Sequence, residues 1–272
     1  MSPDVIAIDR RPKVRVKAVA LPVEHGSWGF LFEPLVAGAA VAPSVASPWI
    51  AVMVIGAFLM RQPLKVILTD WQNGRWLPQT KVATRFLLFY SAIFGVGLTA
   101  SISLATPESF IPFTLVIPFA AYQIYCDATR NSRQLFAELI GSVAISSSIA
   151  VIAIADNWAY SKAFVLWAII IARLIPSILY VRNRLFLEKG KPYSKAVPIL
   201  AHLIAAVFVG GAAINGFAPY LTVFMFGVLL VRSIVGLSSY RKKVKAMKIG
   251  IGELMYGTLT VLSLIVGYYT GF

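Results

Sequence analysis

Nine apolar runs, each close to the length of a membrane-spanning helix, follow one another along this chain with short polar connections between them. They lie at residues 27–46, 47–62, 84–105, 109–126, 135–155, 160–181, 196–215, 217–237 and 252–270. A helix needs about 20 mostly apolar residues to cross the hydrocarbon core of a bilayer, and helices satisfy their own backbone polar groups there. The stretch 42–48, which holds two prolines, turns the chain between the first two runs. The sequence therefore predicts an all-α polytopic membrane bundle of about nine transmembrane helices.

The composition excludes a water-soluble core for most of the chain. Of 272 residues, 58% are hydrophobic and 13% are charged, whereas an average soluble domain has roughly 25% charged residues. The net charge of +14 would suggest nucleic-acid binding in a soluble protein. Here the basic residues separate apolar runs, so we expect no nucleic-acid partner. A single cysteine, Cys126, excludes an internal disulfide and a thiolate metal cluster.

The Lys and Arg residues indicate which connections face the cytoplasm. Of 25 such residues, 22 fall in the N-terminal tail or in connections 61–85, 127–134, 182–195 and 241–248, which share one side if nine spans alternate. Cytoplasmic connections are enriched in Lys and Arg. We therefore predict a multi-pass protein of the cell (inner) membrane with a cytoplasmic N-terminus. Residues 1–23 are interpreted as a basic cytoplasmic tail rather than a cleaved signal, because no apolar segment with a cleavage site directly follows the charges, and residues 24–272 as a single transmembrane domain.

Several ionisable residues fall inside the predicted spans or near their ends: Glu33, Glu138, Arg173, His202 and Arg232. A charged residue at the centre of a span costs about 2.5–3.5 kcal/mol on insertion, so such groups should face the bundle interior or an aqueous cavity. Helical spacing places two polar sets on common faces: Asp127, Arg130, Gln134 and Glu138; and Arg173, Tyr180 and Arg184. We predict that both stripes border one cavity that opens to the cytoplasm. The alternative is that they form structural ion pairs.

Two further segments carry polar groups beside apolar spans. The first is Glu24-His25-Gly26-Ser27-Trp28 with Glu33 and Pro34, which is also typical of an interfacial anchor. The second is the connection 61–85, with Asp70 and Arg75. Oxygen ligands bind Mg²⁺ and Arg binds phosphate, so this connection is a candidate site for a diphosphate head. An amphipathic surface loop would have the same pattern.

At these residues the sequence resembles the YwiC-like family of bacterial membrane proteins. The shared features are Glu24–Trp28, Arg61 to Arg75, Asp127 to Gly141, and Arg173 to Arg182. This resemblance implies a family without implying an activity. A looser resemblance is to the UbiA superfamily of intramembrane prenyltransferases, which have nine helices, a cytoplasmic cavity and catalytic loops after the second and sixth spans. The chain departs from that pattern because paired Asp motifs are absent: Asp70 is alone in the first loop, and 182–195 offers only Glu188.

The leading hypothesis is an intramembrane, prenyltransferase-like transferase that acts on an amphipathic substrate with an isoprenoid or other apolar tail and a phosphate or diphosphate head. In this hypothesis Asp70 and Asp127 hold Mg²⁺ or orient a nucleophile, and His25 or Glu33 is the base. The expected substrate-binding residues are Arg61, Arg75, Arg130, Arg133, Glu138, Arg173, Tyr180, Arg182 and Arg184. The alternatives are a transporter or binding protein for an anion or lipid, and a non-catalytic assembly factor of a membrane complex. Membrane lipids are partners in every case, and the oligomeric state stays open.

Overall fold

Long helices run alternately up and down through the structure, a computed structural model that describes residues 15–22 and 25–272. Within those residues it is all-α, without a strand. The first half comprises α1 (Val16–Ala20), α2 (His25–Val41), α3 (Ser47–Gln72), α4 (Pro78–Leu104), the 3-10 helix η1 (Pro107–Phe110) and α5 (Ile111–Ala128). The second half comprises α6 (Leu135–Ser146), α7 (Ser148–Ala155), α8 (Tyr160–Glu188), α9 (Ala196–Ile214), α10 (Tyr220–Gly236) and α11 (Ala246–Thr270).

Each of the nine predicted runs overlaps a helical segment, with η1 continuing into α5 and α6 continuing into α7. Seven segments of the described chain are long and apolar enough to cross a membrane: α3, α4, η1–α5, α6–α7, α8, α9 and α11. The shorter α10 is also apolar. It has 17 residues, the same length as α2. The predicted all-α membrane bundle is therefore confirmed.

Two predicted loops are wrong, because the helices before them continue. After the second span, α3 extends to Gln72, so the connection expected at 61–85 is only 73–77. After the sixth span, α8 extends to Glu188, where Arg184 Nη2 lies 2.9 Å from Glu188 Oε1 in an i, i+4 ion pair. Such a pair stabilises a helix across one turn. Charged residues that we had assigned to loops therefore lie on the ends of long helices.

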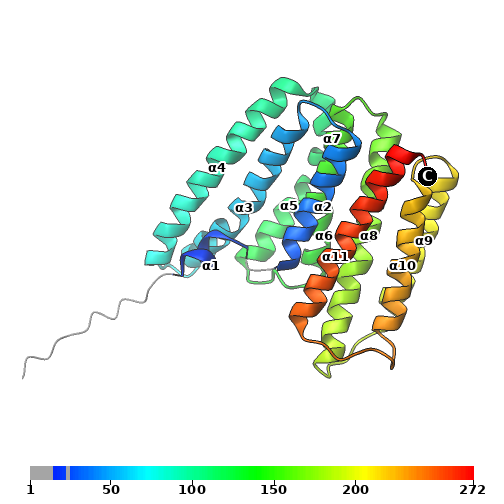
Figure 1. Ribbon diagram of the computed structural model, residues 1–272. Coiled ribbons are helices and arrows are strands. Elements are labelled where there is room, and N and C mark those ends of the chain that lie inside the picture. Colours follow the sequence, from blue (N-terminus) through cyan, green and yellow to red (C-terminus); the bar gives the residue numbers. More distant parts are fainter. Residues whose placement is uncertain (1–14, 23–24) are drawn as a thin grey trace, which may run out of the picture.

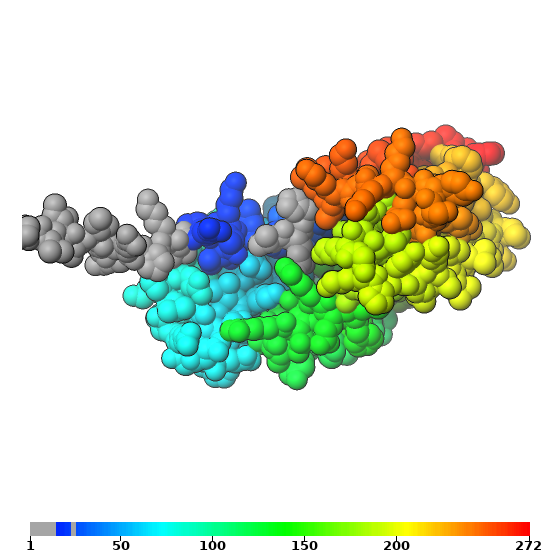
Figure 2. All heavy atoms as spheres, turned by 90° about the horizontal axis from the view of Figure 1, so that it is seen from below, coloured from blue at the N-terminus to red at the C-terminus, as the bar shows by residue number. Residues whose placement is uncertain are grey.

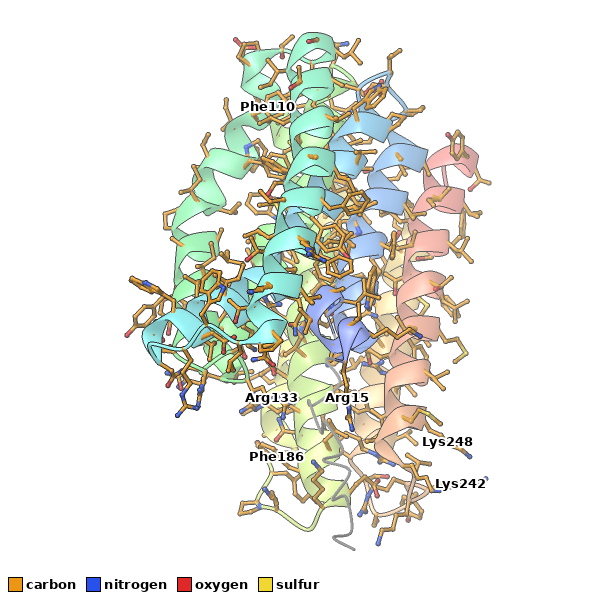
Figure 3. The ribbon with its side chains drawn as sticks, turned by 90° about the vertical axis from the view of Figure 1, so that its left-hand side faces the viewer. Arg15, Phe110, Arg133, Phe186, Lys242 and Lys248 are labelled. Carbon is orange, nitrogen blue, oxygen red and sulfur yellow. The ribbon has the colours of Figure 1, made fainter. Side chains whose placement is uncertain are left out.

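Positive charge gathers at one end of the bundle. The connections 73–77, 129–134, 189–195 and 237–245 contain ten Lys and Arg residues, whereas 42–46, 105–110, 156–159 and 215–219 contain none. Figure 3 shows Arg15, Arg133, Lys242 and Lys248 toward this basic end and Phe110 at the opposite end. Of the predicted tail 1–23, residues 1–14 and 23 lie outside the described part. Its α1 packs against α3 and α4, and Ala18 C=O accepts a hydrogen bond of 2.8 Å from Gln62 Nε2.

The helices form two groups with α2 between them. Seen from the basic end, α3–α6 lie on one side of the molecule and α8–α11 on the other (Figure 2). α2 packs against α7 in the first group and α11 in the second. The α3–α4 pair is especially close, because a Cβ at Gly56 would lie 2.7 Å from the Phe94 backbone nitrogen.

Candidate functional site

A cavity of about 580 Å³ lies between α3, α4, α5 and α6. Its walls are largely apolar and include Met53 and Phe58 from α3, Phe94 from α4, Phe113 from α5 and Ile145 from α6. This volume falls in the range of known ligand pockets, about 300–1,000 Å³. From Phe113 to Asp127 the cavity follows α5 for fourteen residues, which is about 21 Å of helix. It is therefore a long apolar space within the membrane-spanning part of the protein.

Polar side chains meet at the end of this cavity that is nearer the basic end of the bundle. Arg61 Nε donates to Asp127 Oδ2 at 2.6 Å, and Arg61 Nη2 donates to Oδ1 at 3.0 Å. Lys65 Nζ lies 3.9 Å from the same carboxylate and donates to Ser132 Oγ at 2.6 Å. Gln123 contacts the pair in either orientation of its amide, at 3.3 Å from Asp127 Oδ1 or 2.7 Å from Arg61 Nη2.

These polar groups differ in their exposure. The side chains of Arg61 and Lys65 are 27% and 29% exposed, whereas that of Asp127 is 3% exposed. Among the described residues, two cations and one carboxylate meet at the end of an apolar cavity. An arginine fork and a lysine are both common ligands of phosphate and carboxylate. The arrangement is suited to a molecule with an apolar tail and an anionic head.

A second polar group is buried in the other half of the molecule, where α2 meets α8, α10 and α11. Arg173 Nη1 donates to Glu253 Oε1 at 2.8 Å, and its Nη2 donates to Glu33 Oε1 at 3.2 Å. Arg232 Nη1 donates to Glu253 Oε2 at 2.6 Å. We call Glu33, Arg173, Arg232 and Glu253 the charge cluster. Pairing of this kind is required of charges placed within membrane spans.

The rest of the α8 polar stripe continues from this cluster toward the basic end. The Tyr180 ring lies 4.3 Å from Arg232 Cζ, in a cation–π contact. Further along, the buried Arg184 donates to the C=O groups of Gly236 and Lys242. Arg184 thus fixes the connection between α10 and α11 and does not border the cavity.

The remaining predicted substrate-binding residues lie apart from the cavity lining. Arg75, Arg130 and Arg133 are exposed. Glu138 Oε2 accepts from Arg182 Nη1 at 3.4 Å, and Arg182 Nη1 also donates to the Arg133 C=O at 3.1 Å. His25 begins α2, but its side chain lies outside the described part of the chain, so its predicted role stays a prediction.

The structure does not bring the two polar stripes to one cavity. Asp127 and Arg61 border the cavity between α3, α4, α5 and α6, whereas Arg173 and Tyr180 belong to the charge cluster and its surroundings. The expectation of a single shared cavity is therefore wrong. The reason is that Asp127 faces α3, whereas Arg173 faces α2 and α11. The alternative, structural ion pairs, describes the two arginines of the α8 stripe: Arg173 pairs with Glu33 and Glu253, and Arg184 pairs with Glu188.

The two carboxylates predicted to hold Mg²⁺ do not form a common site. Asp70 accepts from Thr80 Oγ1 at 2.5 Å and from Gln79 Nε2 at 3.2 Å, which ties the end of α3 to the start of α4. Both oxygens of Asp127 are engaged by Arg61. Asp70 follows Arg61 by nine residues, about 14 Å along α3. Within the described residues no group of three His, Cys, Asp or Glu side chains comes together.

Three site residues were missing from the sequence-based set: Lys65, Arg232 and Glu253. Lys65 follows Arg61 by four residues, so it would have been placed on the same face had α3 been extended through Pro63. Arg232 is a charge inside a predicted span. Glu253 is the second residue of the predicted span 252–270, but α11 begins at Ala246. Glu253 therefore lies inside a helix and needs buried partners.

Comparison with known protein families matches residues 21–154 to the family described as YwiC-like protein. No curated protein and no solved structure matches the chain. The match begins before α2 and ends within α7. It therefore contains every residue that lines the cavity. Residues 21–154 of this membrane protein are thus similar to the YwiC-like family.

Proposed function

We propose that this protein binds an amphipathic anion of the membrane, a lipid with an apolar chain and a phosphate head, in the cavity between α3, α4, α5 and α6. The observation that carries the proposal is a 580 Å³ apolar cavity that ends at Arg61, Lys65 and Asp127. The chain of the lipid lies along α5. Its phosphate lies at the mouth, where Lys65 and the Arg61 fork donate to its oxygens.

Burial and charge both support this assignment. The apolar walls lie within membrane-spanning helices, so a lipid reaches them without leaving the bilayer. Charged groups at this depth need partners, and an anionic head supplies acceptor oxygens for the donors of Lys65 and Arg61. The basic end of the bundle then faces the cytoplasm, in keeping with the enrichment of Lys and Arg on that side. The described part of the chain begins on the same side, at Arg15 (Figure 3).

An isoprenoid phosphate or diphosphate is one lipid of this chemistry, and an anionic phospholipid is another. Prenyl transfer would use the same cavity, with the diphosphate leaving at Lys65 and Arg61. A transporter or binding protein would hold the same lipid without changing it. A non-catalytic assembly factor would instead co-purify with partner proteins and would leave the cavity without a ligand.

The test is thermal stabilisation of the purified protein in an uncharged detergent. The probes are an isoprenyl monophosphate, an isoprenyl diphosphate, phosphatidylglycerol and the isoprenyl alcohol that lacks the phosphate. A ligand at about 100 times its dissociation constant adds roughly 2.7 kcal/mol to the unfolding free energy. We expect at least one phosphorylated lipid to raise the midpoint and the alcohol to leave it nearly unchanged. Mass spectrometry of the same samples distinguishes an unchanged ligand from a new product.

Matched variants locate the binding site. Ala57→Trp places a large side chain at the cavity wall, and Ala92→Trp places one on the exposed face of α4, outside the cavity lining. Lys65→Gln removes a cation at the mouth, and Lys81→Gln removes an exposed one that does not line the cavity. We expect the first member of each pair to lose the stabilisation and the second to keep it. Stabilisation that survives both Ala57→Trp and Lys65→Gln would place the lipid elsewhere and refute the proposal.

A further inference from the structure

The two carboxylates of the charge cluster are unequally satisfied. Glu253 has an arginine on each oxygen, with Arg173 at 2.8 Å and Arg232 at 2.6 Å. Glu33 has one contact, from Oε1 to Arg173 Nη2 at 3.2 Å. Its Oε2 is buried and accepts no hydrogen bond from any described residue. Since a buried ionised oxygen that accepts no hydrogen bond is costly, Glu33 is the less well supported of the two carboxylates.

The backbone of α11 is shaped to admit Glu33 at this position. A Cβ at Gly257 would lie 2.6 Å from Glu33 Cδ and 2.8 Å from Arg173 Nη2. Any larger residue at Gly257 would therefore occupy the place where Glu33 and Arg173 meet. The carboxyl group is thus held inside the bundle by the packing of two helices and does not reach an interface.

The groups around Glu33 allow both of its charge states. With Glu33 ionised, two arginines balance two glutamates. With Glu33 protonated, Arg173 keeps its bonds to Glu253 Oε1 and to the Glu253 C=O at 3.2 Å. The missing donor at Oε2 favours the neutral form, and Arg173 favours the ionised form. Because these effects oppose each other, the group can exchange a proton.

No other ionisable group in the described residues around α2 contacts Glu33 directly. Arg232 is linked to Glu33 only through Glu253. The Arg232 Cζ lies 4.3 Å from the Tyr180 ring and 4.7 Å from the Tyr256 ring. His202 contacts the Tyr180 ring edge-on. On the other side of α2, α7 has no ionisable residue, Glu138 of α6 pairs with Arg182, and Arg61 and Lys65 of α3 face Asp127.

We propose that Glu33 is a proton-binding site within the membrane, which takes up a proton on its carboxylate and returns it to water. Its partner Arg173 lies eleven residues, about 16 Å along α8, from Arg184 near the basic end. Glu33 binds its proton whether or not a lipid occupies the cavity. It is connected to the cavity through α2, because Trp28 packs edge-on against Phe58, a residue of the cavity wall, with 5.3 Å between ring centroids.

The experiment is infrared difference spectroscopy of the full chain in lipid, without added ligand, as the pH is lowered in steps. A protonated carboxyl without a hydrogen-bond partner gives a C=O stretch separate from that of solvated carboxyls. We expect one such band, equivalent to one group per chain. It should be lost in Glu33→Gln, shifted in Glu33→Asp and unchanged in Glu108→Gln, a change at an exposed residue of the opposite end.

A purely structural role for Glu33 would alter stability without producing this band. Glu33→Asp guards against misfolding of Glu33→Gln, because it retains a carboxyl at the same position. The proposal is overturned if the band persists unchanged in both Glu33 variants. It is equally overturned if the wild-type chain, still folded by its thermal transition, shows no band at any pH.

Discussion

Gly257 offers the sharpest test of how the charge cluster is built. In Gly257→Ala the new methyl group would lie 2.6 Å from Glu33 Cδ and 2.8 Å from Arg173 Nη2. Both distances are far below van der Waals contact, so Glu33 and Arg173 have to separate. Overpacking alone costs about 1–3 kcal/mol, and breaking a buried ion pair costs about 3–5 kcal/mol. Replacing a helical glycine by alanine returns only about 0.5–1 kcal/mol.

The expected net loss of stability is therefore about 3–7 kcal/mol. For a chain of this size 1 kcal/mol corresponds to about 2–4 °C in Tm, so the midpoint should fall on the order of 10 °C. The assay is thermal unfolding in detergent at constant protein and detergent concentration. Gly252→Ala is the matched control on the same helix, because a Cβ there meets no atom within 4 Å. Its midpoint should stay the same or rise slightly.

A double-mutant cycle separates the clash from any general intolerance of α11. In a Glu33→Ala background the obstructing carboxyl is gone, so adding Gly257→Ala should cost much less than it does in the wild-type chain. Equal costs in both backgrounds would refute the role assigned to Glu33. Equal midpoints for Gly257→Ala and Gly252→Ala would refute the close packing itself.

Three further predictions follow from the same contacts. Asp127→Asn removes the carboxylate that occupies the Arg61 fork. A phosphorylated lipid should therefore bind about tenfold more tightly, a gain of about 1.4 kcal/mol in binding free energy. Weaker binding in a thermal titration would mean that Asp127 helps to hold the ligand. Glu33→Gln should flatten any dependence of lipid affinity on pH, measured in the same titration, and a dependence equal to that of the wild-type chain would show that α2 does not couple the two sites. In a Cys126→Ala background, a membrane-impermeant thiol reagent added to intact cells should label Asn215→Cys but not Lys243→Cys, and the opposite pattern would reverse the proposed orientation.

The helices were predictable from the sequence because the bilayer imposes a length and a polarity on each of them. All nine apolar runs overlap a helical segment of the structure. Helix ends were less predictable, because charged residues after an apolar run were assigned to loops. Arg61 and Lys65 continue α3, and Arg184 and Glu188 continue α8, since each finds a partner in the bundle.

The candidate site was only partly predictable, for a different physical reason. Helical spacing places residues on a face of one helix, but it does not say which neighbouring helix that face meets. Arg173 heads a polar stripe on one helix, α8, as predicted. The stripe headed by Asp127 was wrong, because α5 ends at Ala128 and Glu138 belongs to α6. The partners of Asp127 and Arg173, Arg61 and Glu253, are 66 and 80 residues away in the sequence. Such pairings depend on the order of helices around the bundle, which no local pattern encodes.

α2 gives the two sites a common element. The YwiC-like match ends within α7, so it includes the cavity and α2 but not Arg173, Arg232 or Glu253. A chain that ended at α7 would retain the cavity and would leave Glu33 in an apolar surrounding without a cation. Burying an ionised carboxylate without a partner is costly. Glu33 therefore needs Arg173 of α8, which Glu253 of α11 holds in place. Residues 155–272 therefore complete the environment of Glu33, which the first half carries. α2 contacts both halves, through α7 and through α11.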